Sequence, residues 1–561
     1  MDNSRVGRVL CALLGTSVVF ATPACLLKGQ IDTGTPDPKE LGSKLDGGVG
    51  GLGDGGYSPD AGGPPTSTAV CTPPIRPVDT SHPSTVVGTG TPASCTEEVL
   101  NQAILRGGTI AFDCGGNATI PITSQKELRP DVDTTIDGQG QITLNGNGAT
   151  RLFHFRGPNY RTNTATVTLQ NLRLTNGRAT GTPIPEYPSE PAKCARGFRV
   201  DGGGGAIYIQ DGILHVFNTT FENNHGEPLG PDVAGGAIYG LGAREIIVVG
   251  SHFINNSASN GGAIGALNTD LSVYNSIFDG SAALGHDANG WDPDCPPDEE
   301  SGSGGNGGAI CIDGGDNGLV VFCGDTFTRS RGGENAFGGA IFRTPDIEQQ
   351  TTIIDQSTFD ESYSPHSGGA LYFHNSNLQI SKSTFSENRA VSGGSLQADG
   401  TVLQVENSTF ANNHGDLAWG VAALFDVQGD FRNCTFVGNS AGFSPITPEF
   451  AGASIENSVF VGNTSVGGNT ACDAQSAGSG NLQWPQPDRS GPNAPSGCVL
   501  GVSVGDPALS QLGDHGGPTS TFLPGAPSNA LRRGSGCPQT DQRGWPRADR
   551  TACTVGSVEV Q

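Results

Sequence analysis

A phrase of about 25 residues recurs along this chain and restricts what the chain can fold into. Each copy ends on a phenylalanine, and successive phenylalanines are 24 to 49 residues apart, the longer spacings reflecting insertions. The residue five positions earlier is apolar in every copy, and polarity alternates between the two, which predicts short strands. The phenylalanines are Phe221, Phe253, Phe278, Phe327, Phe359, Phe385, Phe410, Phe436 and Phe460. The apolar residues are Val216, Val248, Val273, Phe322, Ile354, Ile380, Val405, Phe431 and Ile455.

Two further positions of the phrase predict turns. Asparagine is preferred three residues before the phenylalanine, as in Asn218, Asn275, Asn407, Asn433 and Asn457. Asparagine tolerates tight-turn backbone angles and can stack into side-chain ladders between successive coils. A glycine pair marks a corner where a side chain would obstruct the turn. It precedes Ala206, Ala237, Ala263, Ala309, Ala340 and Ala370.

Short strands repeating at this period are typical of a β-solenoid, in which each coil buries its apolar face only by stacking on its neighbours. An earlier copy, in which Leu174 replaces the phenylalanine, brings the readable coils to ten. The fold class expected is therefore all-β, with about ten or more coils.

The repeat also resembles a known family. GGAIYIQ…FENN and GGAIYGL…FINN resemble the repeat of chlamydial polymorphic outer-membrane proteins. Over roughly residues 95–561 the chain resembles bacterial right-handed parallel β-helix proteins with a pectin-lyase-like fold. Its end, from GDPALSQ onwards, resembles the choice-of-anchor Q region of such proteins. The resemblance implies a right-handed parallel β-helix and says little about function.

Both ends of such a stack need a cover, because open ends expose edge strands. Residues 96–106, TEEVLNQAILR, place Val99, Leu100, Ala103 and Ile104 at helical spacing after the N-cap residue Thr96. We expect a short helix here to cap the N-terminal end. The region 506–561 is poor in the repeat pattern, and we expect it to close the other end.

The first 24 residues are expected to be a signal peptide of the bacterial lipoprotein type. A basic start and an apolar stretch lead to TPAC, which favours lipidation of Cys25, although Thr22 and Pro23 depart from the usual motif. The alternative is ordinary secretion. Because Leu26, and no aspartate, follows the cysteine, the expected location is the outer membrane or surface of a Gram-negative bacterium. Residues 25–70 are rich in Gly, Asp and Pro and are expected to form a disordered tether.

The β-helix itself is expected over residues 71–505, with insertions at 178–200 and 284–306. The second insertion contains Asp292, Asp294 and Asp298, which are weak candidates for calcium ligands. Their spacing fits no defined calcium loop, so a solvated acidic loop is the favoured interpretation. We expect no bound metal and no cofactor.

Twelve cysteines follow Cys25, an even number that favours disulfides in an exported chain. Proximity suggests four pairs, of which Cys311–Cys323 is expected to lie within one coil. The other three are Cys95–Cys114, Cys472–Cys498 and Cys537–Cys553. Four cysteines remain unassigned, namely Cys71, Cys194, Cys295 and Cys434.

Charge restricts the partners. The formal net charge is −25, with 30 Lys and Arg against 55 Asp and Glu, which argues against nucleic acid and against an anionic membrane surface. Contact with a membrane is expected only through a lipid anchor. A polysaccharide or another surface protein remains as the expected partner of a monomer.

Enzymes of the fold that the resemblance implies include polysaccharide lyases and hydrolases, whose catalytic motifs can be compared with this chain. The chain contains Asn268-Thr269-Asp270, and it has His-Gly pairs at His225, His414 and His515. It lacks the adjacent aspartate pair and the Arg-x-Lys of galacturonan hydrolases. We interpret these motifs as products of the repeat and assign no catalytic residue.

The sequence therefore favours a non-catalytic, exported and lipid-anchored surface protein with an adhesive, structural or carbohydrate-binding role. The alternative is an extracellular polysaccharide lyase or glycoside hydrolase with an unrecognised site. A passenger secreted through its own barrel is disfavoured, because no alternating membrane strands follow the repeats.

Overall fold

The computed structural model describes residues 70–184, 197–288, 302–314, 318–345, 347, 350–425, 427–442, 446–448, 453–465, 468–469, 477–486, 499 and 501–560. All of them belong to one compact unit, Gly62–Gln561. The signal peptide, the lipidation candidate Cys25 and nearly all of the expected tether lie outside the described residues.

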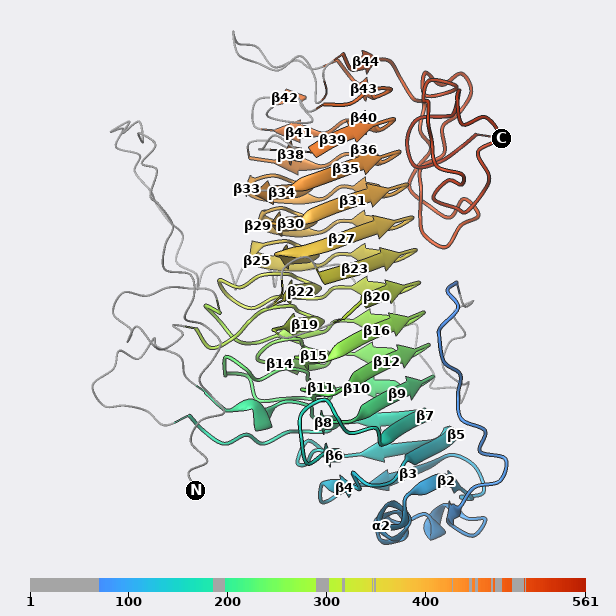
Figure 1. The fold of residues 1–561 in the computed structure, drawn as a ribbon, viewed down its shortest axis with the longest axis vertical. Coiled ribbons are helices and arrows are strands. Elements are labelled where there is room, and N and C mark those ends of the chain that lie inside the picture. Colours follow the sequence, from blue (N-terminus) through green and yellow to red (C-terminus); the bar gives the residue numbers. More distant parts are fainter. Residues whose placement is uncertain are drawn as a thin grey trace, which may run out of the picture. The chain divides into compact units, whose positions relative to one another are not determined.

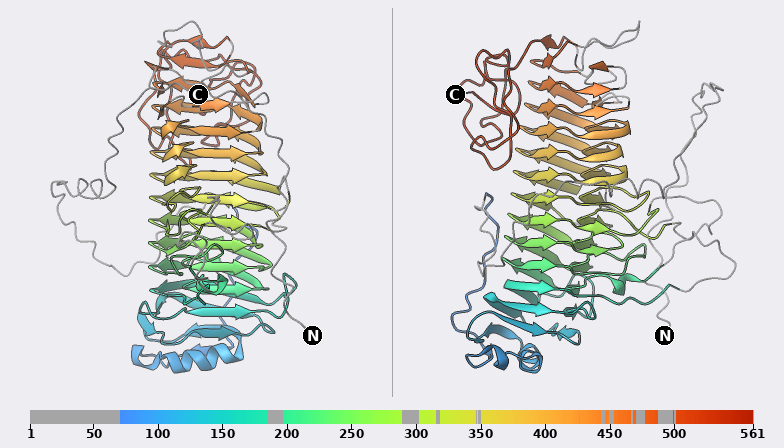
Figure 2. Two further views of the ribbon diagram at one scale, coloured as in Figure 1. Left: turned by 90° about the vertical axis from the view of Figure 1, so that its left-hand side faces the viewer. Right: turned by 180° about the vertical axis from the view of Figure 1, so that it is seen from behind.

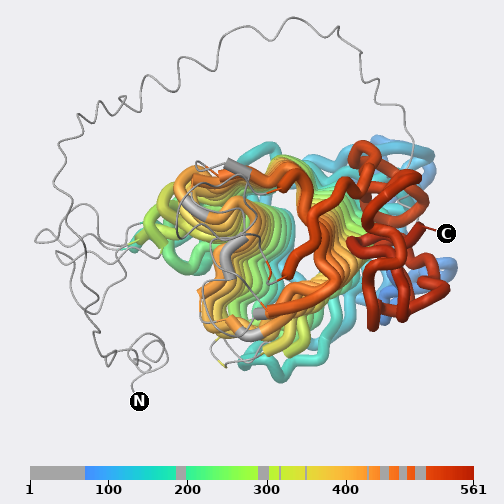
Figure 3. Tube along the Cα trace, turned by 90° about the horizontal axis from the view of Figure 1, so that it is seen from above, coloured from blue at the N-terminus to red at the C-terminus, as the bar shows by residue number. Residues whose placement is uncertain are grey.

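The described chain forms a right-handed parallel β-helix whose coils stack along one axis (Figure 1). Three sheets run along the stack, named A, B and C here. Apart from β41–β42, their strand pairs are parallel. Successive coils superpose when they are viewed down the stack (Figure 3). The expected fold class is confirmed.

Sheet A has two strands per coil and holds both the alternating stretch and the phenylalanine. The first coils contribute β1 (Thr85–Val87), β2 (Gly108–Phe112), β3 (Ala118–Pro121), β5 (Thr134–Asn145) and β7 (Thr166–Thr175). The alternating strands are β9 (Ile213–Phe217), β12 (Glu245–Val249), β16 (Asp270–Tyr274), β20 (Val320–Cys323), β23 (Gln350–Asp355), β27 (Ser376–Ser381), β31 (Val402–Glu406), β35 (Gln428–Arg432) and β39 (Ala453–Glu456). The phenylalanine strands are β10 (Thr220–Glu222), β13 (His252–Ile254), β17 (Ile277–Asp279), β21 (Thr326–Thr328), β24 (Thr358–Asp360), β28 (Thr384–Ser386), β32 (Thr409–Ala411), β36 (Thr435–Val437) and β40 (Val459–Val461). The last strands of this sheet are β43 (Leu482–Trp484) and β44 (Ser503–Val504).

Sheets B and C complete each coil. Sheet B, which begins after the glycine pair, comprises β4 (Lys126–Leu128), β6 (Phe153–Arg156), β8 (Ile207–Gln210), β11 (Ile238–Leu241), β15 (Ile264–Leu267), β19 (Ile310–Asp313), β22 (Ile341–Thr344), β26 (Leu371–His374), β30 (Leu396–Asp399), β34 (Ala422–Phe425) and β38 (Ile446–Pro448). Sheet C comprises β25 (Tyr363–Ser367), β29 (Arg389–Ser392), β33 (His414–Ala418), β37 (Ser440–Ala441), β41 (Thr464–Ser465) and β42 (Gly468–Asn469). The pair β14 (Ser257–Ala258) and β18 (Ala282–Ala283) continues the position of sheet C in earlier coils.

The core is a set of columns in which equivalent side chains lie over one another. Val216, Val248 and Val273 are aligned in adjacent strands and fully buried. The nine phenylalanines form one continuous stack, with ring centroids 4.6 to 5.2 Å apart and planes inclined by 1° to 13°. Offset stacking of this kind adds to the free energy gained by burying apolar area. The recurring phenylalanine is therefore explained by this stack.

The preferred asparagines occupy left-handed turns, as expected. Asn218, Asn275, Asn407, Asn433 and Asn457 have φ between 46° and 52°. Asparagine and glycine enter this region at the lowest cost among the residues. The ladder of side-chain hydrogen bonds, however, lies mainly at a different position.

The ladder is formed three residues after the phenylalanine, where the asparagines are buried. Asn388 Nδ2 donates to Asn413 Oδ1 at 3.0 Å, and Asn413 Nδ2 donates to Asn439 Oδ1 at 2.9 Å. Asn439 Nδ2 continues to Asn463 Oδ1 at 2.9 Å. The same side chains also bind carbonyls of the preceding coil, so this row satisfies backbone groups at the turn. The asparagine of the FxxN motif is thus a buried residue of the turn.

A helix covers the first coil, as expected. α2 (Glu97–Arg106) follows Thr96, whose Oγ1 accepts a hydrogen bond from Val99 N at 3.4 Å. Leu100, Ala103 and Ile104 are buried. The expectation that Val99 shares this apolar face is wrong, because Val99 is 38% exposed. Figure 2 shows the helix at the end of the stack. Two short 3-10 helices, η1 (Pro92–Ser94) and η2 (Val200–Gly202), complete the helical elements of the described chain.

The C-terminal tail, residues 506–560, lies beside the last coils (Figure 1). It contacts the row of left-handed turns, where Asn407 Nδ2 donates to Thr540 O at 3.0 Å and Asn457 Nδ2 donates to Ser535 O at 2.8 Å. Ala530 and Val555 pack on outward-facing apolar side chains of β40 and β43. The expectation that this tail closes the end of the stack is corrected to a cover along its flank. The tail covers this flank because the apolar side chains and asparagine amides there would otherwise face water.

An N-terminal strap covers the same row of turns in earlier coils. It consists of residues 70–82. Gln170 Nε2 donates to Val78 O at 3.0 Å, and Asn275 Nδ2 donates to Cys71 O at 2.8 Å. The strap and the C-terminal tail meet on adjacent coils. Gln356 contacts Cys71 of the strap. In the next coil, Lys382 O accepts a hydrogen bond from Thr519 of the tail. Together the two terminal segments cover one flank of the stack.

Candidate functional site

The cysteines of the described chain form three disulfides. Two of them, Cys95–Cys114 and Cys537–Cys553, agree with the pairs expected from proximity. The third joins Cys71 to Cys323 across 252 residues. Cys472, Cys498, Cys194 and Cys295 lie outside the described residues, so the pair expected for Cys472 and Cys498 stays a prediction.

The expected pair Cys311–Cys323 is wrong. Cys311 lies in sheet B and is free, whereas Cys323 ends β20 in sheet A. Both side chains face outwards from different sheets of one coil, so nearness in sequence does not bring their sulfurs together. Cys434 is also free and buried, in the core.

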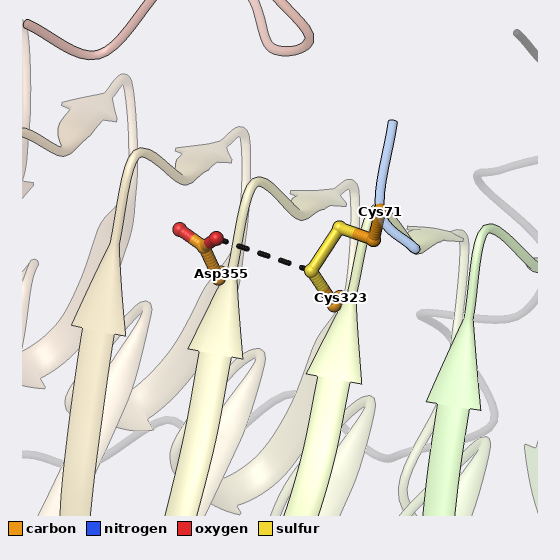
Figure 4. Close-up of side chains that lie close together, drawn as sticks. All are labelled: Cys71, Cys323 and Asp355. Atoms are coloured by element: carbon orange, nitrogen blue, oxygen red, sulfur yellow. Dashed lines mark hydrogen bonds between the residues drawn. A yellow bond between two sulfur atoms is a disulfide. The ribbon is translucent and has the colours of Figure 1, made fainter. Parts of the chain in front are cut away.

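Asp355 lies beside the disulfide of the strap, with Oδ2 3.9 Å from Cys323 Sγ (Figure 4). Two sulfurs and a carboxylate can form a metal site, but here both sulfurs are joined in the disulfide. Protein donors also occupy the carboxylate, since Ser381 Oγ donates to Oδ1 at 2.6 Å and Gln356 Nε2 donates to Oδ2 at 2.9 Å. The disulfide therefore joins the strap covalently to the end of β20. The calcium candidates Asp292, Asp294 and Asp298 lie outside the described residues.

The motif Asn268-Thr269-Asp270 has a structural role. Asn268 adopts φ 53° in a turn, and Thr269 Oγ1 accepts from Ala243 N at 3.0 Å. Asp270 Oδ1 pairs with Arg161 Nη2 at 2.9 Å, which fastens a loop of an earlier coil. These residues connect coils and do not converge on a cavity.

The three His-Gly pairs are far apart in the fold. His225 Nδ1 lies 2.8 Å from Ser257 Oγ and His414 Nδ1 lies 2.7 Å from Ser440 Oγ, in each case one coil further along sheet C. His515 belongs to the tail. Both of the first two pairs therefore follow from the repeat.

His414 belongs to a Ser–His–Asp group, because Asp416 Oδ1 lies 3.1 Å from its Nε2. Nucleophilic catalysis also needs donors for the developing oxyanion. The nearby amides are occupied, since Ser440 N donates to Asn413 O and Gly442 N donates to Gly415 O. Asp416 is in addition paired with Arg389 Nε at 2.8 Å. The described geometry thus lacks an oxyanion hole at this group.

Long connections gather at the corner that follows sheet C and precedes sheet B. They include residues 225–235 and the described parts of both insertions. Aromatic side chains on the outer face of sheet B fasten them. Tyr208 and Tyr239 are 5.7 Å apart in an edge-to-face contact and pack with Ala234. Phe342 and Tyr372 form a second cluster with Cys311. These side chains form small cores beneath the loops.

A small open pocket, with room for about one water molecule, lies between the two clusters. The strand β15 has Gly265 at the outward position there, flanked in register by Tyr239 and Cys311. A Cβ on Gly265 would lie 2.4 Å from Ala234 Cβ, so glycine is needed for the close approach of the loop. Leu267 and Asn260 also line the pocket.

Two acidic residues, Asp232 and Asp313, line the pocket. Asp232 is exposed as a residue, although desolvation of its carboxyl by neighbouring atoms raises the pKa. Burial likewise raises the pKa of the Tyr239 hydroxyl, which donates to Asp232 O at 2.7 Å. Burial also raises the pKa of the Cys311 thiol, which disfavours the nucleophilic thiolate. The pocket therefore offers hydrogen-bonding groups on an apolar floor.

Sequence reasoning did not find this pocket. Tyr239 and Cys311 are 72 positions apart in the sequence, and only the register of sheet B makes them neighbours of Gly265. One signal was available, because Gly265 replaces the tyrosine found at the same place in the two preceding copies, IYI and IYG.

The fold and this surface define a parallel β-helix repeat protein with a loop-bearing lateral corner. Comparison with known proteins agrees at the level of the repeat. Residues 218–241 match the family model described as the Chlamydia polymorphic membrane protein repeat. No match was found among curated protein sequences.

Among solved structures, the chain is similar to the crystal structure of PfbA, a surface adhesin of Streptococcus pneumoniae. The two are 12% identical, the alignment covers 78% of this chain and 99% of that chain, and the TM-score is 0.36. None of the described helices is long and apolar enough to cross a membrane.

Proposed function

We propose that this protein is an exported, non-catalytic surface protein whose β-helix binds a carbohydrate or another surface protein through its loop-bearing corner. The observation that carries the proposal is the concentration of long connections between sheets C and B, held by the buried aromatic clusters of Tyr208–Tyr239 and Phe342–Tyr372. Loops held on a rigid scaffold are where binding residues concentrate.

The pocket beside Gly265 supports a role in recognition. Ligand sites commonly combine an apolar floor with a few polar groups that fix orientation, and a pocket this small suits a single small group of a ligand. Leu267 supplies apolar area, while Asp232 and Asp313 supply oxygen acceptors. The match to a membrane-protein repeat over residues 218–241 is compatible with a surface location.

A lipid anchor at Cys25 is part of the proposal. It rests on the basic start, the apolar stretch and the cysteine that follow the pattern of a lipoprotein signal. Growth with a labelled fatty acid should label the wild-type chain in the outer-membrane fraction, whereas Cys25→Ser should remove the label. Equal labelling of both chains would refute the anchor.

Binding is tested with the purified exported chain on a panel of bacterial and host polysaccharides, with whole-cell adhesion as a second readout. Leu267→Trp fills the pocket and should lower binding at least fivefold, because the added ring occupies the ligand's space. The control is Leu319→Trp, which adds the same ring immediately before β20, where Leu319 is 53% exposed. Equal binding by all three chains would refute the assignment to the pocket.

The alternative is a polysaccharide lyase or hydrolase, and one observation favours it. The raised pKa of Asp232 suits a general acid, with Asp313 lining the same pocket. Chromatography of each polysaccharide after incubation tests this directly. Turnover that is lost in Asp232→Asn would establish the enzyme and refute the non-catalytic proposal.

A further inference from the structure

A second surface stands out on sheet C. Its outward-facing row carries cationic and aromatic side chains and no carboxylate. In register along the stack it comprises Arg178, His225, Ser257, Ala282, Arg331, Tyr363, Arg389, His414, Ser440 and Thr464. In a chain with 30 Lys and Arg among 561 residues and a charge of −25, three arginines in ten positions is a local concentration of positive charge.

The middle of the row is accessible. Arg331 and Arg389 are exposed and Tyr363 is half-buried, whereas Ser364 and Ala390, which alternate with them, are fully buried. The guanidinium of Arg331 lies over the ring of Tyr363 at 5.1 Å from its centroid. Arg389 follows Tyr363 in the next coil. A tyrosine ring therefore stands between two cationic side chains.

The nearby carboxylates leave guanidinium N–H donors of Arg331 and Arg389 available to a ligand. Asp416 Oδ1 accepts from Arg389 Nε at 2.8 Å and lies 3.1 Å from His414 Nε2. This contact uses Nε, and neither terminal nitrogen of Arg389 donates a hydrogen bond to a carboxylate of the described chain. Arg331 has no ion pair with any described carboxylate. Glu387 stands at the preceding turn, where it accepts from Asn412 Nδ2 at 2.7 Å.

We propose that the row from Arg331 to His414 binds an anionic polysaccharide. Carboxylate or sulfate groups pair with the guanidinium groups of Arg331 and Arg389, and a sugar ring packs on Tyr363. The rest of the acidic surface repels such a polymer, which confines it to the row and makes binding depend on salt. This inference rests on the proposed surface-binding function and adds a second binding surface, distinct from the pocket beside Gly265.

The spacing of the row disfavours an acidic peptide. Equivalent side chains in successive coils are about 4.8 Å apart, whereas side chains on one face of an extended peptide recur about every 6.7 Å. A peptide strand running along the axis would fall out of step within two or three coils. A glycan also supplies the ring face that Tyr363 can stack on.

The test uses the full exported chain with four immobilised probes: polygalacturonate, heparin, dextran and poly-glutamate. Binding is measured at about 50 and 300 mM NaCl, a range over which screening of exposed charges increases. We expect binding to polygalacturonate or heparin that weakens with salt, and none to dextran. The double variant Arg331→Ala, Arg389→Ala should lose at least tenfold in affinity. Arg389→Lys should fall between, because lysine keeps the charge without the bidentate geometry.

The matched control is Arg432→Ala, an arginine of sheet A whose side chain is 41% exposed. It should bind within twofold of wild type, and all variants should unfold at the wild-type temperature. Equal affinity of the double variant, or no binding to either anionic glycan, would overturn the proposal. Tight binding to poly-glutamate would overturn it in favour of an acidic protein. If wild type and the double variant bind another polysaccharide of the panel equally, the row fails while the surface-binding function stands.

Discussion

Replacing Phe327 with alanine removes one ring from the middle of the column of nine phenylalanines. The ring is fully buried and stacks on Phe278 at 4.6 Å and on Phe359 at 4.8 Å, with planes inclined by 6° and 1°. It also meets Phe322 edge to face at 6.1 Å. The substitution therefore leaves a cavity bounded by three rings that are themselves held in register by their strands.

The expected cost follows from this geometry. Truncating a buried phenylalanine to alanine costs about 3–5 kcal/mol, including the cavity that remains. Because the neighbouring rings belong to parallel strands that cannot collapse onto each other, we expect the upper part of this range. A loss of about 4 kcal/mol raises the equilibrium constant for local opening by about three orders of magnitude.

Hydrogen–deuterium exchange with mass spectrometry is the suitable assay, because a long stack of coils need not unfold in one step. Amides of β21 and of its partners β17 and β24 should exchange about a thousandfold faster in Phe327→Ala. The control Leu319→Ala lies at the start of the same coil, is 53% exposed, and should change stability by less than about 0.5 kcal/mol. Acceleration of less than tenfold in β21 would refute the reasoning that the stack supports the coils.

Three further predictions concern other positions. Burial raises the pKa of Asp325 well above its usual range, so the folded protein loses stability as the pH rises from about 4 towards that raised pKa. Asp325→Asn removes this pH dependence. Its stability relative to wild type should therefore grow by up to about 1.4 kcal/mol per pH unit between pH 4 and 7, measured by urea titration. A constant difference across that range would count against a neutral buried carboxyl. The double variant Cys71→Ser, Cys323→Ser should lower the free energy of unfolding by about 3–5 kcal/mol and expose residues 70–82 to proteases. Unchanged cleavage of this segment would show that the strap stays in place without its disulfide. Asn413→Ala removes the side-chain partner of Asn388 N and of Phe385 O. We expect it to lower the free energy of unfolding by about 2–4 kcal/mol, measured by thermal unfolding. A smaller loss would contradict the structural role of the ladder.

The repeat made the architecture predictable because its period is a property of every coil. Val216 and Val248 are 32 residues apart in sequence, yet equal distances from their phenylalanines placed them correctly on one face. The helix after Thr96 was predictable for a similar reason, since its cap and apolar spacing are local.

The ladder was assigned to the wrong asparagine because both positions favour the residue for different reasons. Asn407 is selected by its left-handed backbone, and Asn413 by the hydrogen bonds of its buried amide. A single sequence shows the preference and not the cause. In the middle coils Ser330 and Ser362 occupy the second position, which interrupts the ladder without altering the coil.

Contacts across the surface could not be predicted, because they depend on which coils become neighbours of distant segments. The strap brings Cys71 to Cys323, and the tail brings Thr540 to Asn407. Neither pairing has a local signal. The row on sheet C is similar, since Arg331, Tyr363 and Arg389 are 32 and 26 residues apart and align only once the register is known.

The central claim is that coils distant in sequence stack in one register, and an electron-spin distance measurement tests it most directly. His215 and Gln404 lie in one outward row of sheet A, six coil steps apart. With nitroxide labels at His215→Cys and Gln404→Cys, we predict a narrow distribution centred near 29 Å, from about 4.8 Å per step. A broad distribution, or a centre beyond about 45 Å, would contradict the stack and the surfaces inferred from it.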